Sequence, residues 1–267
     1  MNTTQNTDQT PAKTVIFDVQ KAAFAYDGKH TALDNINMTI HAGECAAILG
    51  ANGCGKSTFL KLLDGLYFPT SGSITAFGSP ITEEALRDDD ANFAFRRKVG
   101  LVFQDTDVQL FSPSVLDELA FAPLQLGMDR EEINRRVDWA LETLRIEKLR
   151  DRAPHRLSGG EKRRVALASV LTLDPEVWLL DEPTTGLDPR SQSWLTEFIL
   201  HQREIGKTVV IATHDLVIAE QVATSMFVFS EEHTITASGS PKEILSDHEL
   251  LHRCNLAHYH LDPIFAK

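Results

Sequence analysis

A glycine-rich segment at residues 50–58, GANGCGKST, carries the residue types that bind phosphate groups. It fits the pattern G-x-x-x-x-G-K-S/T in full, with an apolar segment before it and a helical pattern after it. Its glycines allow several backbone N–H groups to point at one phosphate, at the positive end of the following helix. Lys56 adds a flexible positive charge for the β- and γ-phosphates, and Ser57 offers a hydroxyl to Mg²⁺. The alternative, a chance glycine-rich turn, does not account for this context, so the segment predicts a nucleotide site.

Two adjacent acids follow the apolar segment 177–180. The carboxyl end of a parallel strand lies near the phosphate loop in folds of this kind, so Asp181 is expected to reach the Mg²⁺ shell near Lys56. Glu182 is then placed to orient or deprotonate an attacking water. Adjacent acids are usually solvated surface residues, but an apolar strand that leads into them favours a buried site. Together with the phosphate loop, this pair predicts an ATPase.

A second segment suited to binding anions lies at the start of a predicted helix, at residues 157–161, LSGGE. A serine followed by two glycines at a helix start leaves a hydroxyl and free backbone N–H groups. One nucleotide carries only one triphosphate, so two such groups in one chain suggest a site shared between two chains.

With these motifs the chain resembles the ATP-binding cassette (ABC) ATPases over about residues 15–245. LSGGE is similar to their signature motif LSGGQ, with Glu161 in place of Gln. The resemblance implies that Tyr26 stacks on adenine, that Asp188 contacts the opposite subunit, and that His214 holds the γ-phosphate. It also implies that Gln104 touches Mg²⁺ and the attacking water.

The expected site residues form three groups. The catalytic residues are Glu182, His214 and Gln104, and the Mg²⁺ ligands are Ser57, Gln104 and Asp181. The ATP-binding residues are Tyr26, Gly50, Asn52, Gly53, Gly55, Lys56, Ser57, Thr58, Ser158, Gly159, Gly160 and Asp188. The resemblance implies a second ATPase subunit, in a homodimer or a heterodimer, which closes over two ATP molecules.

The segment after Gln104 narrows the resemblance further. In energy-coupling-factor ATPases, similar segments form the groove for a coupling helix; here they read DTDVQLF and SVLDELAFAPLQLG. The segment around the signature motif is most similar to that of cobalt or nickel importers and reads LSGGEKRRVALASVL. The resemblance implies an ATPase subunit that drives uptake of cobalt or nickel through separate membrane subunits. Two alternatives remain: a coupling-factor ATPase for a vitamin or another micronutrient, and a soluble ABC ATPase of the iron–sulfur assembly type. Residues 104–121 argue against the latter.

These residues require a fold that alternates strands and helices. The patterns predict strands at 15–26, 32–40 and 45–49, a helix at 56–63, short strands within 71–103 and a helical stretch at 114–149. Helices at 159–172, 189–204 and 215–223 then alternate with strands at 177–180, 208–212 and 226–230. The acidic run 83–90 is expected to be a solvated loop or a solvated helix face, and no role is assigned to it. The expectation is an α/β P-loop NTPase of the ABC type. It has a mixed sheet core, an antiparallel β subdomain, an inserted α-helical subdomain at about 105–157, and tails at 1–14 (flexible) and 246–267.

Composition limits the partners and the location. The 267 residues are 42% hydrophobic and 24% charged, with a net charge of -12, which argues against a nucleic-acid partner. The sequence shows neither a signal peptide nor an apolar run near the ~20 residues that span a bilayer. These features favour a cytoplasmic chain, and the resemblance implies that it binds peripherally at the cytoplasmic face of the membrane. Cys54 lies in the phosphate loop, where a helix N-terminus can lower the pKa of a thiol and permit redox control, although the family tolerates many residues there.

Histidines gather in the tail 246–267, as His248, His252, His258 and His260, with Cys254 between them. Imidazole and thiolate suit Ni, Co or Zn, but histidine clusters without a defined cage are compositional signals. A solvated tail helix is the preferred interpretation.

Overall fold

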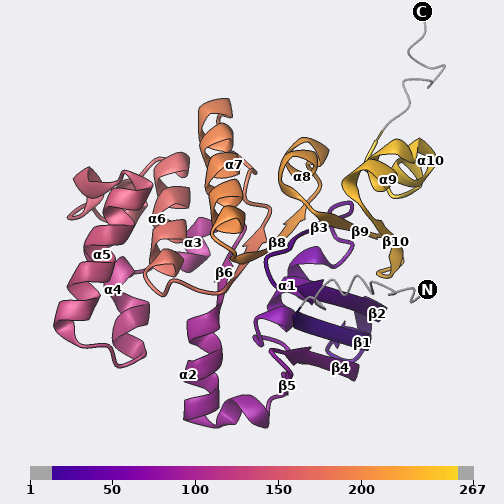
Figure 1. The fold of residues 1–267 in the computed structure, drawn as a ribbon, viewed down its shortest axis with the longest axis horizontal. Helices are drawn as coiled ribbons and strands as arrows, with labels where there is room; N and C mark the ends of the chain where they lie inside the picture. Colours follow the sequence, from indigo (N-terminus) through magenta and orange to yellow (C-terminus); the bar gives the residue numbers. More distant parts are fainter. Residues whose placement is uncertain (1–13, 258–267) are drawn as a thin grey trace, which may run out of the picture.

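The computed structural model describes residues 14–257, so His258 and His260 lie outside the described residues. A six-stranded mixed sheet forms the centre of the fold, in the order β10-β9-β3-β8-β7-β6 (Figure 1). Neighbouring strands are parallel except β10, which pairs antiparallel with β9. The bounds are β3 Cys45–Leu49, β6 Val99–Val102, β7 Val177–Asp181, β8 Thr208–Thr213, β9 Ser225–Phe229 and β10 Ile235–Gly239. The sheet core therefore is mixed, as predicted.

Alternate residues of the central strands face two different cores, because side chains along a strand point to opposite faces. Cys45, Ala47 and Leu49 of β3 pack into the core with the helices that follow β6, whereas Ala46 and Ile48 pack toward the antiparallel sheet and α1 (Lys56–Leu63). Every residue of β3, β7 and β8 is buried, which explains why their sequences are continuous apolar runs.

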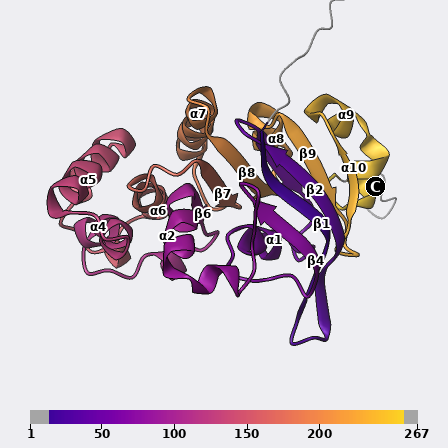
Figure 2. The same cartoon turned by 60° about the horizontal axis from the view of Figure 1, so that its bottom comes forward.

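The antiparallel sheet has the order β2-β1-β4-β5 and lies on the α1 side of the molecule (Figure 2). Its strands are β1 Val15–Tyr26, β2 His30–His41, β4 Ser71–Ala76 and β5 Ser79–Pro80. The turn at Asp27 and Gly28, both at positive φ, joins β1 to β2. This hairpin places Tyr26 and His30 opposite each other.

A group of helices is inserted between β6 and β7 and lies at one end of the molecule (Figure 1). It consists of α3 Thr106–Gln109, α4 Val115–Gln125, α5 Arg130–Leu144, η2 Glu147–Leu149 and η3 Pro154–Arg156, and it leads into α6 Gly159–Leu171. Asp129 caps α5 by accepting a hydrogen bond from the Glu132 N–H at 2.8 Å. Helices α7 (Pro189–Glu204) and α8 (Leu216–Val222) follow the alternation that the sequence predicts.

The segment 71–103 contains a helix that the sequence analysis missed. A short 3₁₀ helix, η1 (Ala85–Arg87), precedes α2, which spans Asp89–Lys98, where strands and a solvated acidic run were expected. Asp88 accepts a hydrogen bond from the Ala91 N–H at 2.9 Å, and further acids lie in the first turn of α2 and bases in its last. The acids at 88–90 thus stabilise a helix N-terminus.

Two short helices follow β10, namely α9 (Pro241–Ser246) and α10 (His248–Arg253), at the opposite end from α5. Leu250, Leu251 and Cys254 are buried, so α10 packs against the domain. Within residues 14–257, no group of three or more His, Cys, Asp or Glu side chains is arranged to hold a metal ion. No helix in that range is both long and apolar enough to span a membrane.

Candidate functional site

The phosphate loop connects β3 to α1, and its glycines are required by the backbone. Gly55 has a φ of 107°, and a Cβ there would lie 2.3 Å from the Ala32 carbonyl oxygen. Gly53 also has positive φ, at 87°. Only glycine adopts such angles without strain, and only glycine lets the loop approach β2 this closely.

Lys56 is buried under the loop and its ammonium group has three partners. Nζ donates to the carbonyl oxygens of Gly50 at 2.8 Å and Ala51 at 3.1 Å, and lies 3.1 Å from Glu182 Oε1. The loop carbonyls and Glu182 therefore hold the ammonium where the predicted phosphate site begins.

Ser57 of the phosphate loop and Asp181 at the end of β7 are distant in sequence but in direct contact. Ser57 Oγ donates to Asp181 Oδ1 at 2.9 Å. Burial raises the pKa of Asp181, while the Ser57 hydrogen bond and the charge of Lys56 oppose the rise. A hydroxyl, a carboxylate and, from Gln104, a side-chain amide are oxygen donors of the kind that Mg²⁺ prefers, so the residues present fit this ion.

Glu182 follows β7 and is 3% exposed, with a φ of 40° that is unusual for a residue other than glycine. Its Oε2 lies 2.9 Å from His214 Nδ1 and accepts a hydrogen bond from Thr213 Oγ1 at 3.3 Å. The end of β8 therefore brings His214 to Glu182. Strained backbone of this kind concentrates at functional sites, which agrees with the position of Glu182 beside Lys56.

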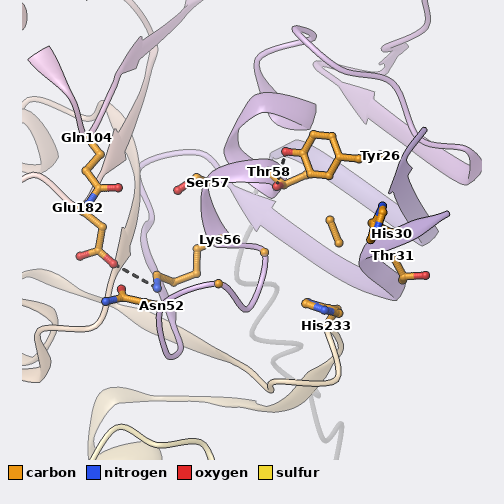
Figure 3. Close-up of a pocket in the computed structure, with 13 residues that line it drawn as sticks. Tyr26, His30, Thr31, Asn52, Lys56, Ser57, Thr58, Gln104, Glu182 and His233 are labelled. Carbon is orange, nitrogen blue, oxygen red and sulfur yellow. Dashed lines mark hydrogen bonds and ion pairs between the residues drawn. The ribbon is translucent and has the colours of Figure 1, made fainter. Parts of the chain in front are cut away.

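These groups share one cavity of about 420 Å³ (Figure 3). The expected site residues that line it are Tyr26, Asn52, Gly53, Gly55, Lys56, Ser57, Thr58, Gln104 and Glu182. Gly50, Asp181 and His214 do not line it but bond to residues that do. His30, Thr31, Ala32 and His233 also line the cavity, and the sequence analysis did not single them out.

Tyr26 forms an aromatic cluster at the edge of this cavity. Its ring lies edge-on to Phe24 and Tyr67, with centroids 5.1 Å and 5.8 Å apart, and its hydroxyl lies 2.9 Å from Thr58 Oγ1. The side chain is still 38% exposed. A ring that is fixed by neighbours but open on one side is suited to stacking on a base.

A second cavity of about 1020 Å³ contains the remaining expected nucleotide-binding residues, which are Ser158, Gly159, Gly160 and Asp188. It shares no lining residue with the first cavity. Ser158 caps α6 in a reciprocal arrangement with Glu161, whose Oε2 accepts hydrogen bonds from Ser158 N at 2.8 Å and Ser158 Oγ at 2.9 Å. Asp188 caps α7 in a similar manner. The structure thus does not bring these four residues to the phosphate loop of the same chain.

Arg163 connects the two regions. From α6 it donates to the carbonyl oxygens of Phe103 at 2.7 Å and Gln104 at 2.8 Å, and it is buried. A movement of α6 therefore acts directly on the segment that carries Gln104.

An apolar groove of about 520 Å³ lies beside the Gln104 segment, between α2, α3 and α4. Phe93, Val108, Phe111 and Phe121 line it and remain 40%, 69%, 64% and 41% exposed. Glu118 accepts hydrogen bonds from the N–H groups of Phe111 and Ser112 at 3.0 Å and 2.8 Å, which fixes this side of the groove.

The thiol of Cys54 does not have the lowered pKa that a helix N-terminus can produce. The thiol is buried, and burial raises its pKa although Lys56 opposes the rise. Desolvation of the thiolate outweighs the positive surroundings, which agrees with the sequence-based interpretation that redox control is the less favoured role for Cys54.

A family model, curated relatives and solved structures all match this chain to ATP-binding proteins of ABC transporters. Residues 33–185 match the family described as ABC transporter. The chain is 49% identical over 246 residues to the nickel import ATP-binding protein NikO of Rhodobacter capsulatus, covering 91% of this chain and 96% of that protein. The structure of CbiO1 from Clostridium perfringens, described as part of the ABC transporter complex CbiONQ, matches with a TM-score of 0.77 and 38% identity, over 94% of this chain and 98% of that one. The dimeric cassette MJ0796 bound to ADP and Pi, in a post-hydrolysis state, matches with a TM-score of 0.76 and 28% identity, over 85% of this chain and 99% of that one.

Proposed function

The chain belongs to the ATP-binding proteins of ABC transporters, and on that premise we propose that it is the ATPase subunit of an energy-coupling-factor importer for a transition-metal ion. Nickel and cobalt are the proposed ions, because NikO is a nickel import protein and because the segment LSGGEKRRVALASVL is most similar to cobalt or nickel importers. The chain would bind peripherally at the cytoplasmic face of the membrane, where separate membrane subunits carry the ion.

The apolar groove is the observation that carries the importer proposal. Large apolar side chains, Leu66 among them, remain exposed along the groove, and Glu118 holds the backbone at Phe111 in place. Exposed apolar patches of this kind mark interaction sites. We propose that a helix of a membrane subunit packs there, since CbiO1 is part of a transporter complex. Gln104 lines the ATP cavity next to this groove, and Arg163 ties it to α6. A partner in the groove would therefore influence the ATP site.

ATP hydrolysis is assigned to the first cavity. In this proposal Lys56 and the loop N–H groups bind the triphosphate, and Ser57, Asp181 and Gln104 hold Mg²⁺, which would offset phosphate charge as the bond breaks. Glu182 accepts the proton of the attacking water and His214 holds the γ-phosphate. Such catalysis consists of positioning and electrostatic stabilisation.

A second copy is proposed to complete each site. The four residues of the second cavity bear groups suited to phosphate but lie apart from the phosphate loop of their own chain. A head-to-tail dimer places them over the partner's nucleotide, an arrangement that the dimeric relative MJ0796 supports.

The test replaces Phe111 in the groove. In cells whose only copy carries Phe111→Asp, uptake of radioactive Ni²⁺ and Co²⁺ should be lost, and membrane proteins should no longer co-purify with the chain. The matched control is Ile205→Asp, which introduces the same charge at an apolar residue after α7 that is 54% exposed. Both purified variants should keep the parental basal ATPase rate. Parental uptake of both ions by Phe111→Asp would contradict the metal-importer proposal, and unchanged co-purification would contradict the groove assignment.

A further inference from the structure

His233 lies in the turn between β9 and β10, and its side chain lines the ATP cavity. The turn is fixed in place, because the His233 carbonyl oxygen accepts a hydrogen bond from Asp34 N–H at 2.9 Å and thereby joins the turn to β2. The imidazole is therefore presented to the cavity by two elements that are distant in sequence.

The conformation of His233 is costly and the turn itself does not need a histidine. Its φ is 64°, in the left-handed region where glycine is unstrained and other residues are strained. Its Nδ1 is buried and has no hydrogen-bond partner among residues 14–257. A buried polar atom without a partner is itself unfavourable. No hydrogen bond of Nδ1 within residues 14–257 offsets these costs, so a role toward a ligand accounts for the histidine better than a structural role.

The position of His233 indicates which part of a ligand it meets. In Figure 3, Lys56, Glu182 and Gln104 lie toward one end of the cavity, and Tyr26, His30, Thr31 and His233 toward the other. The first end carries the groups for the triphosphate. A nucleotide that extends from there brings its ribose and base between Tyr26 and the histidines.

We propose that His233 binds the nucleoside part of the nucleotide, with an imidazole nitrogen hydrogen-bonded to the ribose or the base, on the side of the cavity opposite Tyr26. His30, at the start of β2, extends the same wall. The inference rests on the proposed use of this cavity for ATP.

The test compares ATP with inorganic tripolyphosphate, which has the phosphates but no nucleoside. Isothermal titration of the full chain with Mg²⁺ should show that His233→Gly weakens ATP binding about three- to ten-fold, the range for one lost hydrogen bond, and leaves tripolyphosphate binding unchanged. Glycine relieves the left-handed strain, so the variant should melt at the parental temperature or above it. Asn255→Gly, which relieves the same backbone strain at a φ of 55° outside the cavity, is the matched control and should bind ATP normally.

The outcomes separate this inference from the assignment of the cavity. If His233→Gly binds ATP as tightly as the parent, or weakens both ligands equally, His233 does not bind the nucleoside. Lys56→Ala should weaken both ligands, and parental binding of both by that variant would instead reject the cavity as the ATP site.

Discussion

Glu182 lies between Lys56 and His214, and its two carboxylate oxygens are divided between them. Burial and a left-handed backbone fix the carboxylate at the end of β7, so that little reorganisation is needed when a substrate binds. The same oxygen that approaches His214 also accepts the Thr213 hydroxyl. A single residue thus connects the phosphate loop to the end of β8.

We expect Glu182→Gln to lower ATP turnover about 10²- to 10⁴-fold, the usual contribution of a general base, and to leave ATP binding intact. The amide keeps the shape and the acceptor for Thr213 but cannot take a proton. A phosphate-release assay and an ATP titration measure the two effects.

Glu176→Gln is the control, because it removes the same charge at the residue before β7, at the far end of the strand. Turnover by Glu182→Gln at the parental rate would show that another group activates the water.

Residue types and spacing were sufficient to predict that the phosphate loop and the acid pair form one group, and the resemblance added Tyr26. The structure brings them to one cavity or into direct contact with its walls. His30 and His233 could not be predicted, because their position depends on two hairpins that meet through the Asp34–His233 hydrogen bond. The only local signal was a histidine in a β turn, which alone indicates nothing about a ligand.

The N-terminus of α6 is capped by Ser158 and carries the negative charge of Glu161 in its first turn. Hydrogen bonds from Ser158 lower the pKa of Glu161, and Arg152, 3.5 Å away, acts in the same direction. Glu161 is therefore a carboxylate, and it accepts a hydrogen bond from the hydroxyl of Ser158, a residue that we assign to the partner's phosphate. A bound γ-phosphate must compete with this carboxylate and is repelled by it.

Glu161→Gln should strengthen ATP-dependent dimerisation about two- to five-fold at low salt, since an amide oxygen preserves the cap but not the charge. The gain should shrink as the salt concentration rises. Analytical ultracentrifugation with ATP at two salt concentrations measures it.

Ser240 and Glu243 form the same reciprocal cap at α9, at the opposite end of the molecule, so Glu243→Gln is a matched control. An equal effect of both substitutions, or weaker dimerisation of Glu161→Gln, would contradict the repulsion argument.

Asp64 at the end of α1 is buried and pairs with the partly exposed Arg96 of α2, with Nη1 and Oδ2 2.8 Å apart. Burial raises the pKa of Asp64 to about 7, although the Arg96 guanidinium opposes the rise. In the unfolded chain this carboxyl titrates near pH ~3.9, so the folded state takes up a proton as the pH falls below 7. The fold is therefore favoured by protonation of Asp64, and this contribution is lost as the pH rises through about 7.

Arg96→Met should destabilise the fold by about 3–5 kcal/mol at pH 8.5, where it leaves a buried unpaired charge. At pH 5.5 the Asp64 carboxyl is neutral, so Arg96→Met should lower the free energy of unfolding by clearly less. Urea denaturation at both pH values measures this. Asp64→Leu combined with Arg96→Met removes both charges and should abolish the pH dependence; an equal deficit of Arg96→Met at both values would contradict the argument.

Elements with strong periodicity were predicted well, including the buried strands β3, β7 and β8. Helix α2 was missed because its apolar positions are few and its acids resemble a solvated run. Its stability depends on capping by Asp88 and on contacts such as that of Arg96 with Asp64, which no local pattern shows. The groove likewise depends on how α2, α3 and α4 pack, although the resemblance predicted its place.

At the scale of the whole molecule, groups suited to binding phosphate occur in two places on a chain of net charge -12. They line two cavities without a common residue, and Arg163 is one of the side chains that connect α6 to the Gln104 segment. The net charge of the chain therefore does not predict whether a phosphate can bind at these two places. Local backbone N–H groups and Lys56 determine that instead. A second copy would bring both halves together.

Complementation between two inactive variants tests this shared site most directly. Lys56→Ala disables the phosphate loop and Ser158→Arg disables the cap of α6, so each alone should hydrolyse almost no ATP. In an equimolar mixture, half of the dimers pair one variant with the other, and each mixed dimer contains one site with an intact loop and an intact cap. We expect the mixture to recover about a quarter of the parental ATPase rate. A mixture that stays as inactive as its components would show that each chain uses its own residues alone, and would contradict the account.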